Sequence, residues 1–99
     1  MRLTPEQIRV IKSAVSRIID AESDIWLFGS RVDDTKRGGD IDLFIETTQV
    51  VPNRVSALCK LEGALVMGLG DRKIDVLLKD ARTVDAPIFR SARQQGVLL

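Results

Sequence analysis

The stretch Asp40-Ile41-Asp42-Leu43-Phe44-Ile45 decides how this chain folds. It starts with polar and apolar residues in alternation and ends in a fully apolar run, a pattern typical of a β-strand with a buried face. Side chains two residues apart on a strand point to the same face, so Asp40 and Asp42 share one face while Ile41 and Leu43 occupy the other. At a separation of about 6.5–7 Å along the strand, the two carboxylates can converge on one cation.

Two further apolar segments predict neighbouring strands. Residues 25–28 form a short apolar run that stops at Gly29, and residues 73–78 (KIDVLL) repeat the alternation with Asp75 opposite the core side. If the 73–78 strand lies next to the 40–45 strand, Asp75 lies beside the aspartate pair, because Cβ atoms on paired strands are only about 4.5–5.5 Å apart. A carboxylate in so apolar a strand is expected to be buried and to need a partner.

Three helices complete the expected fold. Thr4-Pro5-Glu6-Gln7 predicts a helix start with a capping box, and apolar residues at three-to-four spacing extend this helix to about Asp20. Similar patterns predict helices over residues 54–69 and 87–95. The order α-β-β-α-β-α predicts an α+β fold, with a small mixed β-sheet of about three strands covered by helices, in a single domain over residues 1–99. The apolar tail 97–99 either covers the sheet or offers a contact surface.

The composition excludes several kinds of chemistry. The 99 residues contain no histidine and a single cysteine, Cys59, so histidine-based catalysis, histidine-ligated zinc and an internal disulfide are ruled out. A net charge of +1 gives no general attraction to nucleic acid or to anionic lipid. With no long apolar run and no signal-peptide pattern, we expect a cytoplasmic protein without membrane contact and without direct nucleic-acid binding. We expect Cys59 and Trp26 to be core residues, and Met67 to lie in the core or in an interface.

The three aspartates Asp40, Asp42 and Asp75 together predict a metal site. Three carboxylates packed together repel one another, and a divalent cation relieves that repulsion. Oxygen ligands without imidazole or thiolate select Mg²⁺, with Mn²⁺ as an alternative. Two such ions about 3.5–4 Å apart would activate an attacking oxygen and steady a leaving phosphate. The plainer alternative is that Asp40 and Asp42 belong to a solvated strand face.

A second feature is the pair Gly29-Ser30 at the end of the 25–28 strand. Glycine there allows backbone N–H groups to approach a phosphate, and serine adds a hydroxyl, although such a pair can also be an ordinary turn. Arg31, Lys36 and Arg37 follow and could neutralise a triphosphate, or could belong to a solvated loop.

The stretch Leu27-Phe28-Gly29-Ser30-Arg31, followed after a short polar segment by Asp40-Ile41-Asp42-Leu43, resembles the hallmark of the polymerase-β-like nucleotidyltransferase superfamily. From about residue 5 to residue 99 the chain is similar to its minimal nucleotidyltransferase (MNT) domains. The resemblance implies a polymerase-β-like palm in which Gly29, Ser30 and Arg31 bind the triphosphate. It further implies that Asp40 and Asp42 bind both metal ions, and that Asp75 completes the site where the acceptor hydroxyl is activated.

The resemblance also implies a function. Such a domain transfers a nucleoside monophosphate, here AMP from ATP with two Mg²⁺ ions, to an acceptor hydroxyl and releases pyrophosphate. Standalone members commonly pair with a small helical HEPN-type protein, as antitoxin to its toxin, and some attach AMP to that partner. Two alternatives stay open: a catalytic subunit of a two-chain small-molecule nucleotidyltransferase, and a catalytically idle antitoxin that acts by binding. A homo-oligomer is compatible with each.

Overall fold

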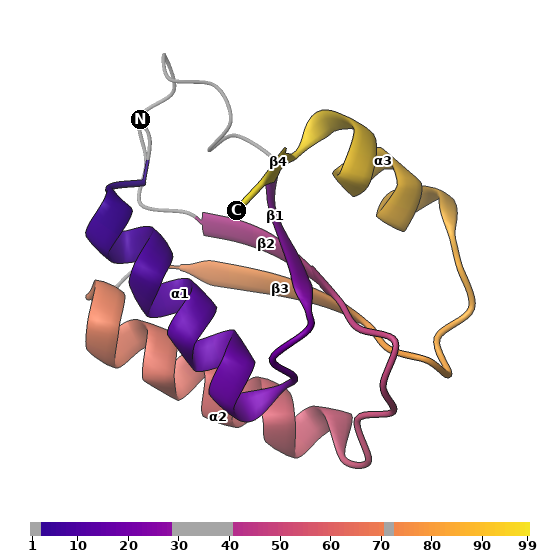
Figure 1. Ribbon diagram of the computed structural model, residues 1–99, viewed down its shortest axis with the longest axis horizontal. Coiled ribbons are helices and arrows are strands. Elements are labelled where there is room, and N and C mark those ends of the chain that lie inside the picture. The colour runs from indigo at the N-terminus through magenta and orange to yellow at the C-terminus, as the bar shows by residue number, and fades with distance from the viewer. Residues whose placement is uncertain (1–2, 29–40, 71–72) are drawn as a thin grey trace.

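The computed structural model describes residues 3–28, 41–70 and 73–99 (Figure 1). Within these ranges the chain forms three helices and one four-stranded sheet. In chain order the elements are α1 (Pro5–Ile18), β1 (Asp24–Phe28), β2 (Ile41–Glu46), α2 (Arg54–Leu69), β3 (Ile74–Lys79), α3 (Pro87–Gln95) and β4 (Val97–Leu98). The expected α+β class with a small mixed sheet is confirmed.

The strands lie side by side in the order β3-β2-β1-β4. β2 and β3 are parallel, and α2 supplies the crossover that parallel neighbours require. β1 is antiparallel both to β2 and to β4. β2 therefore lies inside the sheet with a strand on each side, whereas β3 forms one edge.

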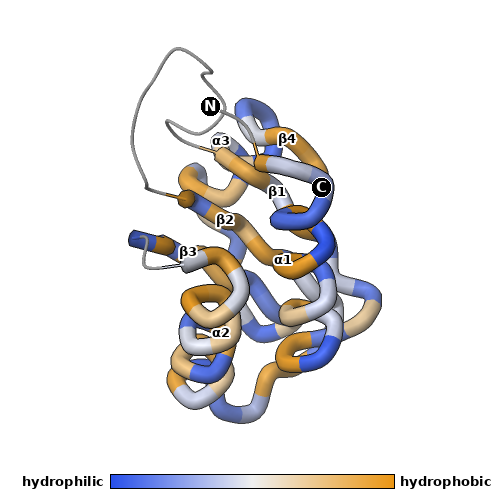
Figure 2. The backbone as a smooth tube through the Cα atoms, turned by 90° about the vertical axis from the view of Figure 1, so that its left-hand side faces the viewer, coloured by the Kyte–Doolittle hydropathy of each residue, from blue (hydrophilic) through white to orange (hydrophobic). Residues whose placement is uncertain are grey.

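The helices cover the two faces of the sheet unequally. α1 and α2 lie side by side on one face, and α3 lies over part of the other (Figure 1). Apolar residues that alternate along β1, β2 and β3 point toward α1 and α2, and Figure 2 shows these orange segments gathered in the middle of the molecule. The core made in this way includes Ile11, Val15, Ile25, Leu27, Ile41, Leu43, Ile45, Leu61, Leu65, Ile74 and Leu78. Burial of each large apolar side chain contributes about 1.5–3 kcal/mol to folding.

Local signals in the sequence fix the ends of the two longer helices. At the start of α1, the Thr4 hydroxyl accepts from the Gln7 N–H at 3.1 Å, and the Thr4 N–H donates to Gln7 Oε1 at 2.8 Å. This reciprocal pair is the predicted capping box. At the start of α2, Asn53 Oδ1 accepts from the Ser56 N–H at 3.0 Å. α2 ends at Leu69 and is capped by Gly70, whose φ of 91° lies in the left-handed region that favours glycine.

The structure differs from the sequence-based expectations at several element ends. α1 stops at Ile18 rather than near Asp20, because the Asp20 carboxylate accepts from the Glu22 N–H and begins a turn. Of the tail residues 97–99, Leu99 packs against the core. Val97–Leu98 instead forms β4, a short strand that extends the sheet beside β1 and leaves both side chains at least half exposed.

Two of the expected core residues also lie elsewhere. Cys59 is exposed on α2 and is not part of the core. Trp26 is half-buried on the sheet face opposite α1 and α2, outside the main apolar cluster. Met67 is 89% exposed, which excludes a place in the core. In the part of the chain that the structure describes, no helix is long and apolar enough to span a membrane.

Candidate active site

Asp42 and Asp75 lie side by side at one end of the sheet. They are register partners on the parallel strands β2 and β3, and such neighbouring strands are about 4.8 Å apart. Because Ile41, Leu43 and Ile74 are buried in the core, alternation places both carboxylates on the opposite face of the sheet. The predicted adjacency of these two aspartates is confirmed.

The two aspartates and Phe28 form a row across three strands, which we call the aspartate row. Phe28, the last residue of β1, is the register partner of Asp42 on its other side. Residues 29–31 follow Phe28 directly in the chain, and residue 40 precedes β2 directly. The predicted site residues Gly29, Ser30, Arg31 and Asp40 themselves lie outside the described residues, as do Lys36 and Arg37.

The two aspartates differ in exposure. Asp42 is half-buried, as expected for a residue between two neighbouring strands. Asp75 is exposed, and the expectation that it would be a buried carboxylate is wrong. Its strand is apolar in sequence, but β3 lies at the edge of the sheet, where only one side of the strand pairs with another strand among the described residues. The Asp75 carboxylate is therefore open to molecules that approach this edge.

The next row of the same face is aromatic and is covered by α3. Phe44 on β2 stacks against Trp26 of β1 and against Phe89 of α3, with ring centroids 5.3 Å apart in both pairs. The Arg93 guanidinium lies 5.6 Å from the centre of the Phe44 ring. Such aromatic pairs and cation–π contacts each contribute about 0.5–1.5 kcal/mol. They hold α3 on the sheet immediately beside the aspartate row.

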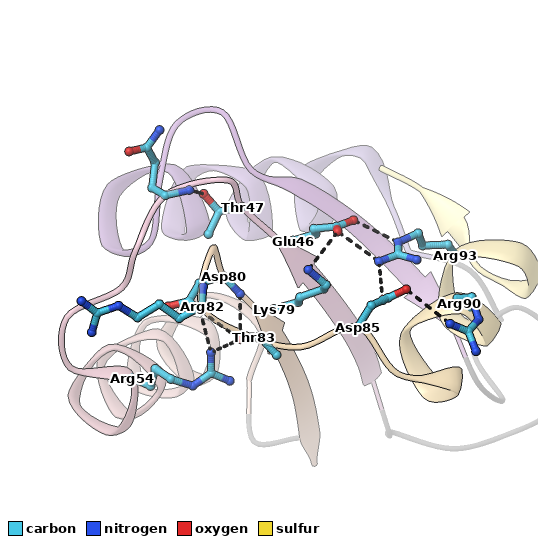
Figure 3. A network of polar contacts seen from close by, with 11 residues as sticks. Glu46, Thr47, Arg54, Lys79, Asp80, Arg82, Thr83, Asp85, Arg90 and Arg93 are labelled. Carbon is cyan, nitrogen blue, oxygen red and sulfur yellow. Dashed lines mark hydrogen bonds and ion pairs between the residues drawn. The ribbon is translucent and has the colours of Figure 1, made fainter.

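A third row is charged and fixes the orientation of α3 (Figure 3). Arg93 donates to both carboxylate oxygens of Glu46, each at 3.0 Å, and also to Asp85 at 3.0 Å. Lys79 Nζ approaches Glu46 at 3.9 Å, and Arg90 approaches Asp85 at 3.5 Å. The hydrogen bonds to Glu46 and Asp85 raise the pKa of Arg93, and the hydrogen bond from Arg93 lowers the pKa of Asp85.

Sequence reasoning did not identify this network, although one signal for it was present. The alternation that places Asp42 and Phe44 on one face continues to Glu46, so all three face α3 or the space beside it. The partner Arg93 could not be inferred, because its position depends on how α3 returns to the sheet.

The chemistry of the aspartate row fits a hard divalent ion. Asp42 and Asp75 present carboxylate oxygens from two neighbouring strands, and the chain has no histidine to compete with them. Among the described residues no group of three or more candidate metal ligands gathers in one place. The third carboxylate of the predicted site, Asp40, falls outside those residues.

Two comparisons with known proteins were informative. No curated protein sequence matches the chain significantly. A family model described as a nucleotidyltransferase domain matches residues 8–89, which extend from α1 through β1, β2 and β3 into α3. The matched segment holds the whole aspartate row and covers most of the sequence. The chain therefore belongs to the nucleotidyltransferase domain family and is a nucleotidyltransferase.

Proposed function

We propose that this protein transfers AMP from ATP to a hydroxyl group of a partner protein in a reaction that requires Mg²⁺. The single observation that supports this proposal best is the register of the sheet, which pairs Asp42 with Asp75 on neighbouring strands. Family members in general use a nucleoside triphosphate and a divalent metal ion, and this carboxylate pair suits both requirements.

In the proposed mechanism, Asp40, Asp42 and Asp75 hold the metal, and Gly29, Ser30 and Arg31 bind the triphosphate. Bound divalent ions would neutralise phosphate charge and act as Lewis acids at the reacting oxygens. The acceptor oxygen attacks the α-phosphorus and forms a new P–O bond, while the bond to the bridging oxygen breaks and pyrophosphate leaves. Asp75 helps to remove the proton of the acceptor hydroxyl, a role that its exposure on the edge strand favours.

The proposed acceptor is a small helical HEPN-type protein, to which this chain would act as antitoxin. Two considerations support a protein acceptor. The resemblance to minimal nucleotidyltransferase domains points to such a pair, and the exposed Asp75 is accessible to a surface as well as to a small molecule. The sequence contains no tyrosine, so a tyrosine acceptor has to come from another chain.

Replacement of each aspartate tests the proposed site. The protein is incubated with Mg²⁺ and ATP labelled on the α-phosphate, with and without a purified HEPN-type protein encoded beside it. Label is expected on that second protein. Asp42→Asn and Asp75→Asn should each lower the transfer rate by about 100-fold or more, because a positioned acid–base or metal-binding group is lost.

Asp24→Asn provides the matched control. Asp24 is an exposed strand aspartate at the other end of β1, so this change removes one carboxylate without reaching the aspartate row. It should leave the transfer rate unchanged. Equal activity of the wild type and Asp42→Asn would contradict the proposed site. Efficient labelling of a small molecule without any second protein would contradict the proposed acceptor.

A further inference from the structure

A groove runs between α1 and α2 on the side of the molecule away from the aspartate row. Its volume is about 470 Å³. One wall is a line of α1 residues at four-residue spacing, Arg9, Ser13 and Arg17. From Arg9 to Arg17 the line covers about 12 Å of helix, which corresponds to roughly two helical turns.

The floor of the groove is apolar and made of small residues. Val10 and Ala14 of α1 meet Ala64 and Gly68 of α2 there. A Cβ added to Gly68 would lie 2.5 Å from Val10 Cγ1, so the two helices approach closely only because residue 68 has no side chain. Because these small side chains do not protrude between α1 and α2, the groove leaves space for a helix that lies along it.

The α2 wall carries an unusual side chain for a surface position. Met67 is 89% exposed beside the apolar floor. Methionine is flexible and polarisable, and exposed methionines are frequent at surfaces that bind other proteins. A methionine at the rim of an apolar groove therefore indicates a docking surface for an apolar partner stripe.

The charges along the groove are positive. Arg9 forms an ion pair with Glu6 of its own helix, whereas Arg17 forms none with the described residues. Among those residues, no carboxylate lines the groove. Of the two arginines that line the groove, Arg17 is thus the one that a negatively charged ligand would pair with.

We infer that this groove, defined by Arg9, Val10, Ser13, Ala14, Arg17, Ala64, Met67 and Gly68, is a docking site for an amphipathic helix of another protein. That helix carries an apolar stripe flanked by Asp or Glu residues. Its apolar side chains lie on the floor against Met67, and a carboxylate beside them pairs with Arg17. The groove and the aspartate row lie on opposite faces of the sheet, so this inference does not depend on the nucleotidyl-transfer proposal.

Two other occupants fit the groove less well. A second copy of this chain offers no suitable helix, because α1 and α2 each expose one glutamate and α3 contains no acidic residue. A nucleic acid would gain little from an apolar floor, and the chain has a net charge of only +1.

The test uses a synthetic helical peptide with a leucine stripe flanked by glutamates, and a control peptide in which lysines replace the glutamates. Binding is followed by the Met67 ε-methyl NMR signal of the intact protein. The acidic peptide should shift this signal saturably, and the lysine peptide should bind about tenfold more weakly. Arg17→Glu should reverse that preference, which a merely structural role for Arg17 would not do. Arg82→Glu, an exposed arginine outside the groove, should leave the preference unchanged.

Each alternative has a distinct result that would overturn the inference. Equal binding of the two peptides, or no binding of the acidic one, would exclude the charge-complementary helix. A concentration-dependent shift of the Met67 signal without peptide would identify a second copy as the occupant. Tighter binding of a short RNA duplex than of the acidic peptide, lost in Arg17→Glu, would identify nucleic acid.

Discussion

Asp80 lies just after β3, at the end of the sheet opposite the aspartate row, and is only 2% exposed. Its carboxylate accepts from the Val51 N–H at 2.9 Å, from the Arg82 N–H at 3.0 Å and from the Thr83 hydroxyl at 2.9 Å. Arg54 lies 3.5 Å away (Figure 3). The hydrogen bond from Val51 is the largest cause that lowers the pKa of Asp80, while burial opposes it. Through these hydrogen bonds the Asp80 carboxylate links the loop that follows β2 to the turn that follows β3.

Asp80→Ala should destabilise the fold by about 2 kcal/mol or more at pH 7, because the N–H groups of Val51 and Arg82 lose the buried carboxylate that accepts from them. The folded-state pKa of Asp80 is below the unfolded value, so its contribution to stability is present above about pH 4 and is lost as the pH falls through the folded-state pKa. Urea unfolding at pH 7 and pH 3 measures both effects. If the wild type and Asp80→Ala lose equal stability between these pH values, Asp80 is not the titrating group.

Two glycines should respond to alanine in opposite directions. An added Cβ at Gly63, inside α2, meets nothing within 4 Å, so Gly63→Ala should stabilise the protein by about 1 kcal/mol through helix propensity. A Cβ at Gly96 would lie 2.4 Å from the Ala92 carbonyl oxygen and 3.0 Å from that of Leu27. Since these are backbone atoms, Gly96→Ala should lower the melting temperature. Thermal melts of the two variants check both signs; a higher melting temperature of Gly96→Ala would contradict the packing described at Gly96, and a lower one of Gly63→Ala would contradict the open space at Gly63.

Among the elements, the helices were the most predictable from sequence. Their ends depend on local chemistry, such as the capping box at Thr4 and the glycines after α2 and α3. β4 was not predictable, because two residues show no alternation and the strand exists only through its pairing with Trp26 and Leu27. The adjacency of Asp42 and Asp75 followed from matching strand patterns. The exposure of Asp75 did not, since it depends on strand order, which is a non-local property.

One of the contacts that hold α3 on the sheet is Phe89, whose ring stacks on Phe44. Phe89→Ala should destabilise the fold by about 3 kcal/mol through loss of apolar burial and stacking. It should also loosen α3 over Trp26, the single tryptophan of the sequence, whose ring also stacks on Phe44. Fluorescence emission under native conditions should therefore move to longer wavelength. Ile88→Ala, at an exposed position of the same helix, is the control and should change neither quantity. An unchanged spectrum in Phe89→Ala would mean that α3 does not shield the tryptophan.

For the whole molecule, ligand binding to the proposed site should raise global stability. Mg²⁺ with ATP at one hundred times its dissociation constant should add about 2.7 kcal/mol to the free energy of unfolding. Asp42→Asn should abolish this gain while the ligand-free protein remains folded. Arg17→Glu, on the opposite face of the sheet, should retain the gain in full. Thermal melts with and without Mg-ATP measure the effect, and an equal shift in the wild type and Asp42→Asn would place the nucleotide elsewhere.

The interior position of β2 also determines how rarely the backbone around Asp42 opens. Edge strands such as β4 open by local fraying, and their amide hydrogens exchange with water through small openings. β2 has a hydrogen-bonded strand on both sides and its core-facing residues Ile41, Leu43 and Ile45 are fully buried, so its amides exchange only when the whole sheet comes apart. The backbone of Asp42 therefore stays in place through the everyday fluctuations of the protein, and its spacing from Asp75 changes when the edge strand β3 frays rather than when β2 moves.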